Sequence, residues 1–418
     1  MRRAGKASRP RLSTRQAPLA QNTAMIPRPE ISARLPPLVL VAAGAIGFAY
    51  LVQLGLMLAG HGWIADASGH PLAQDFLSFW SAGHLALSGH PATAYDWPAM
   101  HALQQQLMGQ AWKGYLGWAY PPLFFLIAIP LALIPYTASF LIWVCTTLAL
   151  YVVAIARVAR ERGAALLACA TPAALGCAMP GQNGFLSAAL IAGALLQLET
   201  RPLLAGMLMG LLTYKPHLGL LFPVALMFGG YWRALFSAAV TTILILILSW
   251  LLAADSLAAF AAHLGSMSNN FLTEGTAGFF RQQSLYGLLR MSGVGDHAAF
   301  AAQGVLFAAM AVFIGWLWRG SHSLALKCAG LCAAGLLATP YLYFYDFPIL
   351  SVAIAFLWRD RPFSRRETWM LIASQLAMTA FLFVDAPMGF AAALLALLAI
   401  GERIAGTAVT TAPQPRTA

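Results

Sequence analysis

Long apolar stretches separated by short polar segments make up most of this chain. The first runs from about residue 37 to 59, and twelve more follow it. These twelve lie at about 121–135, 137–157, 164–179, 184–198, 202–213, 216–230, 234–253, 298–318, 323–338, 345–358, 367–384 and 388–401. A helix of about 20 apolar residues spans the bilayer core. The pattern therefore predicts an all-α fold, a polytopic bundle of transmembrane helices.

The longest polar interruption follows the first apolar stretch, at about residues 60–118. It is too rich in His, Gly and Gln to cross a membrane. Within it, the apolar spacing over residues 97–109 predicts a helix that lies along the membrane surface. We expect residues 60–118 to form one large extracytoplasmic loop.

The positions of Lys and Arg predict the topology, because cytoplasmic loops carry the excess of positive charge. With the N-terminal segment inside, the only basic residues of the 25 that fall outside are Lys113, Lys215, Arg281 and Arg290. Both termini are then cytoplasmic, which requires an even number of crossings. We expect about 12, with the proline-rich stretch 121–135 entering the membrane without crossing it.

Composition supports a membrane protein, since 60% of the 418 residues are hydrophobic and 9% are charged, against about 25% charged in soluble domains. The net charge of +11 is not gathered in a basic patch with exposed aromatic residues, which argues against nucleic-acid binding. The basic, Pro-rich residues 1–35 predict a disordered cytoplasmic tail. We expect the membrane domain at 36–404 and a second disordered tail at 405–418.

Several polar clusters interrupt the apolar stretches on the predicted outer side. They are Asp75, Tyr95-Asp96, Tyr120-Pro121-Pro122, Gly181-Gln182-Asn183-Gly184, Lys215-Pro216-His217, Arg281-Gln282-Gln283 and the segment from Tyr341 to Asp346. A charge at the centre of a membrane helix costs roughly 2.5 to 3.5 kcal/mol. Lys215, which stands in the mainly apolar run LLTYKPHLGLL where two of the stretches meet, therefore requires a partner or a function.

The order and spacing of these clusters resemble glycosyltransferase family 87, which uses polyprenyl-phosphate sugars and belongs to the GT-C superfamily. The resemblance extends over about residues 40–400. It implies a GT-C-type bundle in the bacterial inner (plasma) membrane that transfers a hexose, often mannose, to a lipid or glycan acceptor on the outer face. It also implies inversion at the anomeric carbon, no nucleotide donor, and a catalytic base at the position of Asp75.

The chemistry of such a transfer requires a carboxylate to take the proton of the acceptor hydroxyl and cations to meet the charge on the leaving phosphate. The candidate cations are Lys215, Arg281 and His217. The other candidate substrate contacts are Tyr95, Asp96, Tyr120, Gln182, Asn183, Gln283, Tyr341, Tyr345 and Asp346. Tyr95 and Asp96 would, by the resemblance, shape the loop more than react.

Structural roles compete with these assignments at several positions. Asp75 and Asp96 are both residues that favour helix N-caps. The Gly181 to Gly184 segment fits a tight turn, and Lys215 fits a side chain that reaches the membrane interface. The tyrosines from Tyr341 to Tyr345 fit an interfacial aromatic belt. Asp346 also fits the second acid of a retaining mechanism.

Metal binding and transport are two other functions to compare with this sequence. Five histidines lie in the first loop, but their spacing matches no metal-ligand pattern, and we expect neither a metal nor a cofactor. A transporter or lipid flippase would also use broken helices and intramembrane charges. Such proteins often contain two similar halves, and we find no internal repeat here. The long polar loop with its acid favours the enzyme.

Overall fold

The computed structural model describes residues 35–109, 113 and 116–411 of the chain. Helices hold 76% of the residues, and no strand occurs in the described part, where Ala65 and Pro71 form an isolated bridge. The prediction of an all-α fold is confirmed. The tail predicted at 1–35 lies almost entirely outside the described residues, whereas helix α17 extends beyond residue 404 and ends at Thr411.

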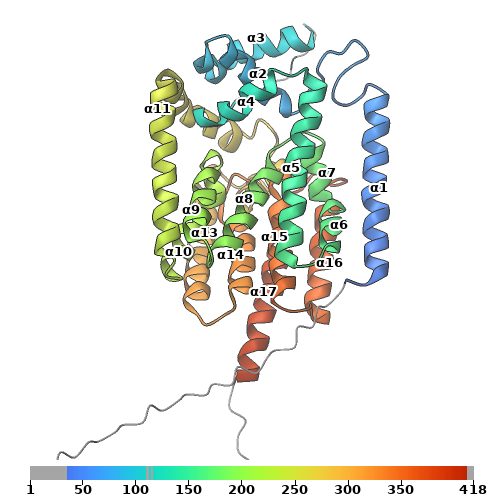
Figure 1. Cartoon of the computed structure of the whole chain (residues 1–418), viewed down its shortest axis with the longest axis vertical. Coiled ribbons are helices and arrows are strands. Elements are labelled where there is room, and N and C mark those ends of the chain that lie inside the picture. The colour runs from blue at the N-terminus through green and yellow to red at the C-terminus, as the bar shows by residue number, and fades with distance from the viewer. Residues whose placement is uncertain (1–34, 110–112, 114–115, 412–418) are drawn as a thin grey trace, which may run out of the picture. The chain divides into compact units, whose positions relative to one another are not determined.

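The α-helices follow one another along the chain with short connections (Figure 1). Their bounds are α1 Pro37–Ala59, α2 Phe76–Leu87, α3 Trp97–Met108, α4 Phe125–Ala132, α5 Tyr136–Ala159, α6 Gly163–Cys169, α7 Pro172–Ala178, α8 Gly184–Gln197, α9 Pro202–Leu211, α10 Phe222–Phe228, α11 Trp232–Ser268, α12 Leu285–Met291, α13 Asp296–Arg319, α14 Leu324–Ala338, α15 Pro348–Asp360, α16 Arg365–Ala380 and α17 Met388–Thr411. Single helical turns lie between them: η1 Pro91–Tyr95, η2 Pro122–Phe124, η3 Leu212–Tyr214, η4 Pro216–Gly219, η5 Asn269–Thr273, η6 Phe279–Arg281 and η7 Phe344–Asp346.

Five of the described helices, α1, α5, α11, α13 and α17, are individually long and apolar enough to cross a bilayer. Shorter apolar helices of 10–17 residues accompany them. The chain is thus a multi-pass membrane protein, and the number of about 12 crossings stays a prediction.

Prolines explain where the structure departs from the apolar stretches. The stretch 164–179 is divided into α6 and α7, because Pro172 starts a new helix and the Thr171 hydroxyl caps it by accepting from the Ala174 amide at 3.3 Å. The stretch 216–230 likewise begins as the 3₁₀ turn η4 before α10. These short helices lack the length of a complete crossing.

Helix α11 is longer than its apolar stretch at 234–253. The helix continues through Asp255 to Ser268, with non-helical backbone angles at Ala253 where its two parts meet. Its second part contacts η5 and leads to the segment that contains Arg281. The segment after residue 253, which we expect to be external, is therefore partly helical.

Helices α2, α3 and α4 lie together at one end of the helix bundle, the upper end in Figure 1. The helix predicted at 97–109 is confirmed as α3, and its position along the membrane surface stays a prediction. Helix α4 has eight residues, about 12 Å of helix, which is too short to cross. Gly83 allows α2 to pack closely on α4, since a Cβ atom there would lie 2.2 Å from the Ala128 carbonyl oxygen.

The basic loops gather at the opposite end of the bundle (Figure 1). Arg359, near the end of α15, donates to the carbonyl oxygens of Arg157 and Val158 at the end of α5, at 3.4 and 3.3 Å. Two of the basic segments that we expect in the cytoplasm are thus in direct contact.

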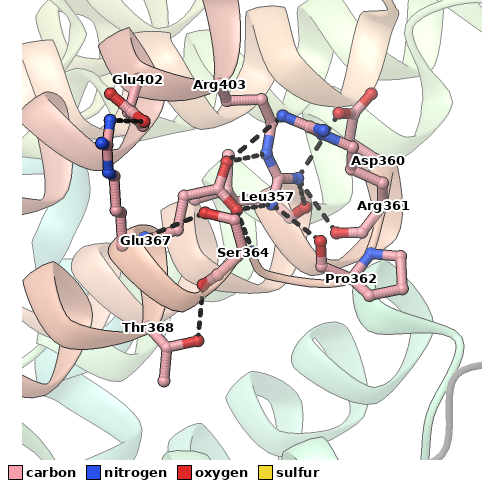
Figure 2. Close-up of polar contacts among 10 residues, drawn as sticks. Leu357, Asp360, Arg361, Pro362, Ser364, Glu367, Thr368, Glu402 and Arg403 are labelled. Carbon is pink, nitrogen blue, oxygen red and sulfur yellow. Dashed lines mark hydrogen bonds and ion pairs between the residues drawn. The ribbon is translucent and has the colours of Figure 1, made fainter. Parts of the chain in front are cut away.

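A buried ion cluster joins α15, α16 and α17 at this end (Figure 2). The Arg403 guanidinium, which is fully buried, donates to both carboxylate oxygens of Glu367 at 2.9 and 2.7 Å and lies 3.4 Å from Asp360. It also donates to the carbonyl oxygens of Leu357 and Arg361. With its donors satisfied, this charge is compatible with burial.

Candidate active site

Asp75 stands at the N-cap position of α2, yet its side chain makes no capping hydrogen bond. Instead Oδ2 accepts a hydrogen bond from Nε2 of Gln182 at 3.0 Å. The start of α2 is attached to the same region, since the Phe76 amide donates to the Pro180 carbonyl oxygen at 2.9 Å. The carboxylate is therefore directed toward the turn before α8.

The surroundings of Asp75 combine apolar packing with nearby cations. Phe76, Leu77 and Phe79 are completely buried, while Asp75 itself is partly exposed. Burial raises the pKa of the Asp75 carboxyl above its ordinary value of 3.8, although the Gln182 hydrogen bond and the charges of Arg281 and Lys215 act in the opposite direction. Such a shift strengthens the carboxylate as a proton acceptor.

The Gly181 to Gly184 segment forms the tight turn that its composition predicts. Gly181 has a φ of +68°, a left-handed conformation that favours glycine, and its carbonyl oxygen accepts from the Trp143 indole at 2.9 Å. Gly184 serves a different purpose. A Cβ atom there would lie 1.7 Å from the carbonyl oxygen of Tyr345, so only glycine allows this close approach.

Gln182 lies between Asp75 and Tyr120. Its Oε1 accepts from the Tyr120 hydroxyl and from the Asn183 backbone amide, both at 3.3 Å. Asn183 is completely buried, with its side chain beside the Tyr120 hydroxyl. Three of the predicted site residues are thus in direct contact with one another around Asp75.

Lys215 and Asp346 form a second centre. Their Nζ and Oδ1 atoms are 2.6 Å apart, and the residues are only 4% and 0% exposed. Lys215 occupies the break between η3 and η4, because Pro216 disfavours a helical conformation in the residue before it. Oδ2 of Asp346 accepts from the Tyr343 amide at 3.2 Å. The buried lysine therefore has the partner that its burial requires.

Three tyrosines form an aromatic wall beside this pair. The Tyr343 ring stacks on Tyr345 at 5.4 Å and meets Tyr341 edge-on at 5.1 Å. Lys215 Nζ lies 4.7 Å from the Tyr345 ring centre, and the His217 ring lies 5.2 Å from Tyr341. Tyr341 and Tyr343 precede η7 and Tyr345 lies within it, so one short segment brings the three rings together. The sequence analysis gave Tyr343 no site role, although its spacing of two from Tyr341 and Tyr345 indicates one.

Arg281 differs from Lys215 in its environment. Its side chain is exposed, and it makes no ion pair within the part of the chain that the structure describes. Its charge acts on the carboxyl of Asp75 and on the hydroxyl of Tyr343. The segment that carries it is attached to the aromatic wall, since the Gln283 amide donates to the Leu342 carbonyl oxygen at 2.7 Å.

Three of the predicted substrate contacts have side chains that bond to the protein backbone instead. The Tyr95 hydroxyl donates to the Tyr120 carbonyl oxygen at 2.7 Å inside the core. Asp96 is exposed and caps α3 by accepting from the Ala99 amide at 3.3 Å, which confirms the cap interpretation. The Gln283 side chain bonds to backbone at both ends, accepting from the Gly389 amide and donating to the Phe280 carbonyl oxygen.

An apolar groove of about 470 Å³ begins next to Lys215. Its lining comes from α9, η3, η4, α10 and α11, and Pro216 is one of the lining residues. The lining residues are Met209, Leu212, Thr213, Pro216, Gly219, Leu220, Phe222, Pro223, Leu226, Leu235, Ala238, Ala239, Thr242 and Ile243. Among the described residues, no three His, Cys, Asp or Glu side chains gather where they could bind a metal ion.

The comparison with protein families matches residues 118–340 to glycosyltransferase family 87. The matched region covers more than half of the chain and contains Tyr120, Gln182, Lys215 and Arg281, while Asp75 precedes it. Searches among curated proteins and among solved structures give no match. The family match and the membrane helices show that this chain is a member of glycosyltransferase family 87.

Proposed function

We propose that this protein is an inverting hexosyltransferase that uses a polyprenyl-phosphate sugar, with mannose as the first candidate sugar. The acceptor is a lipid or glycan on the outer face of the bacterial inner membrane. Membership of the family supports glycosyl transfer. The observation that carries the proposal is the Asp75 carboxylate, which is free of any capping role and held by Gln182.

Asp75 acts as the general base of the transfer. The acceptor hydroxyl loses its proton to the carboxylate while its oxygen attacks C1 of the sugar, and the bond from C1 to the carrier phosphate breaks with its electron pair leaving on the phosphate. One carboxylate is sufficient for this single displacement. Asp346, the other acid of the site, is occupied by Lys215, which argues against a role as the nucleophile of a retaining mechanism.

Arg281 is the best placed cation for the leaving phosphate. The charge of Lys215 is already compensated by Asp346 inside the protein, whereas Arg281 is exposed and unpaired within the described residues. A guanidinium also offers paired donors that match the geometry of a phosphate. The departing polyprenyl phosphate would then be stabilised by Arg281 as its negative charge develops.

The apolar groove beside Pro216 supports a lipid-linked donor. Its lining is almost wholly hydrophobic, with hydroxyl groups from Thr213 and Thr242. An isoprenoid chain gains free energy by burying its surface against such a wall. The phosphate at its end would then lie near the polar centre that contains Lys215 and Asp346.

The test compares Asp75→Asn with wild type in nanodiscs, using radiolabelled polyprenyl-phosphate mannose and other polyprenyl-phosphate hexoses. We expect transfer to fall by about 10²- to 10⁴-fold, the usual contribution of a general base. Asp66→Asn is the matched control, since Asp66 lies in the same loop and its side chain bonds only to Ser68 and His70. This control should keep its activity.

Full activity in folded Asp75→Asn protein would contradict the assignment of the base. Nucleotide sugars should give no transfer, and efficient use of one would contradict the polyprenyl-phosphate donor. Solute uptake by proteoliposomes that contain no lipid-linked sugar would favour the transporter alternative instead.

A further inference from the structure

We infer that Gln182 is a positioning residue, which orients the Asp75 carboxylate and leaves its Oδ1 atom as the oxygen that receives the proton. This inference rests on the proposed role of Asp75 as the base. Gln182 would then act through Asp75 rather than by touching the substrate. This role differs from the substrate contact that we expect for Gln182 from the sequence.

The orientation of the Gln182 amide follows from its neighbours. The Asn183 backbone amide can only donate, and it points at one end of the side-chain amide at 3.3 Å. That end must therefore be the oxygen, to which the Tyr120 hydroxyl also donates. The NH₂ group consequently faces Asp75, at 3.0 Å from Oδ2.

The turn that contains Gln182 is held from several sides. The Gln182 backbone amide donates to the Cys177 carbonyl oxygen at 3.1 Å, and the Trp143 indole fixes the preceding residue, Gly181. The Gln182 residue is 7% exposed. A side chain held this way presents its donor in a fixed direction, which is what an oriented carboxylate requires.

The two oxygens of Asp75 are consequently different. Oδ2 accepts the bond from Gln182, whereas Oδ1 has no hydrogen-bond partner among the described residues. A carboxylate oxygen that already accepts a strong hydrogen bond is the weaker proton acceptor of the two. Oδ1 is therefore the oxygen available to the acceptor hydroxyl.

Other groups also influence Asp75 and enter any pH dependence. The charged groups are Arg281 and Lys215, and the titratable hydroxyls belong to Tyr120, Tyr136, Tyr341, Tyr343 and Tyr345. Burial raises the pKa of Asp75 and the Gln182 hydrogen bond lowers it. Loss of that bond should raise the pKa further, so that a higher pH is needed to ionise the base.

The experiment measures kcat/KM against pH for Gln182→Leu and wild type with the full-length protein in nanodiscs. We expect the acid limb of the kcat/KM profile to shift to higher pH by about one unit in Gln182→Leu. At a given pH on that limb, kcat/KM should then be about tenfold lower than in wild type. KM should change little, and activity should largely return at alkaline pH. Tyr120→Phe should give a smaller shift in the same direction.

Gln104→Leu is the matched control. Like Gln182, Gln104 is buried, but its side-chain amide bonds only to the backbone of Leu116. Its pH profile should match that of wild type. An unchanged acid limb in Gln182→Leu, whether activity falls equally at every pH or not at all, would overturn the inference.

A second readout does not depend on activity. Infrared difference spectra, with Asp75→Asn as the reference, follow the carboxyl stretch of Asp75 as the pH is changed. The midpoint should be higher in Gln182→Leu than in wild type, and equal midpoints would overturn the inference. The infrared titration of Asp75 needs no substrate. Absence of transfer by the wild-type protein would therefore contradict the proposed function and leave the effect of Gln182 on Asp75 to be decided by the infrared midpoints.

Discussion

At the scale of single residues, Lys215 shows how a buried charge is accommodated. Its ammonium group and the Asp346 carboxylate are 2.6 Å apart, and both are shielded from solvent. Because Asp346 also accepts from the Tyr343 amide, the pair fixes the turn that carries the aromatic wall. We therefore assign Lys215 a structural role in addition to any electrostatic one.

Removal of either partner should be costly. Lys215→Met or Asp346→Leu leaves one buried charge uncompensated, and we expect each to destabilise the fold by about 3–5 kcal/mol. The double variant Lys215→Met/Asp346→Leu should recover much of this loss. Thermal unfolding followed by fluorescence-detected size-exclusion chromatography measures the effect.

Equal destabilisation in the double and single variants would contradict a pairwise role for Lys215. The activity of the double variant separates two functions of Lys215. Recovery of transfer with recovery of the fold would restrict Lys215 to structure. A stable but inactive double variant would show that at least one member of the pair also takes part in transfer.

Residue identity alone predicted part of this site. A lysine within an apolar stretch requires a partner, and the Gly181 to Gly184 composition predicts a turn. The identity of the partner did not follow, because Asp346 lies 131 positions away. Nor did the need for glycine at 184, which arises from the backbone of Tyr345.

At the scale of helices, the Arg403 cluster holds α15, α16 and α17 together (Figure 2). Arg403→Met would leave the buried Glu367 carboxylate without its main partner, and we expect a loss of about 3–5 kcal/mol. Arg366→Met is the matched control. Arg366 pairs with Glu402 on the surface with 80% of its side chain exposed, so its loss should cost less than about 1 kcal/mol.

The pH dependence of stability provides an independent check on this cluster. Burial by itself would raise the pKa of Glu367, but the bonds from Arg403 and the Ser364 amide hold it below its ordinary value of 4.5. The ionised Glu367 carboxylate should contribute fully to the free energy of unfolding above about pH 4.5. This contribution should fall as the pH drops through the lower pKa that Glu367 has in the folded state. Unfolding curves of Glu367→Gln should lack this acid-dependent component. Equal stability of Arg403→Met and Arg366→Met would contradict the structural role of the cluster.

Helix boundaries were predictable only in part, and for a local reason. The stretch 37–59 coincides with α1, because nothing within it interrupts the helix. The stretch 164–179 was read as continuous, yet Thr171 and Pro172 stop one helix and start another. Local capping and proline chemistry thus override an uninterrupted apolar composition.

At the scale of the whole molecule, the basic loops lie at one end of the helix bundle and α2, α3 and α4 at the other (Figure 1), and Asp75 stands at the start of α2. We expect the basic end to face the cytoplasm. In a variant without native cysteines, Ser68→Cys in the loop that precedes α2 should react with a membrane-impermeant maleimide in intact cells. Ser321→Cys, in the loop between α13 and α14, should react only after permeabilisation. Both positions are exposed in the structure.

The opposite labelling pattern would invert the topology and move the active site to the cytoplasmic face. Labelling of both positions in intact cells would indicate damaged membranes, which a cytoplasmic marker protein detects. The result also bears on the number of crossings, since residues 68 and 321 on opposite sides require an odd number between them.

The sequence by itself determined the class of this protein, because apolar stretches and sparse charge require a membrane and helices. It also determined which polar residues are unusual, and the order of these residues is the basis of the resemblance to glycosyltransferase family 87. Only the tertiary structure decided their contacts: Asp75 with Gln182, Lys215 with Asp346, and Tyr343 with Tyr345. Asp75 and Gln182 are 107 positions apart, and no local pattern encodes such a pairing. It arises when the close packing of α2, α5 and the turn before α8 brings the two side chains together.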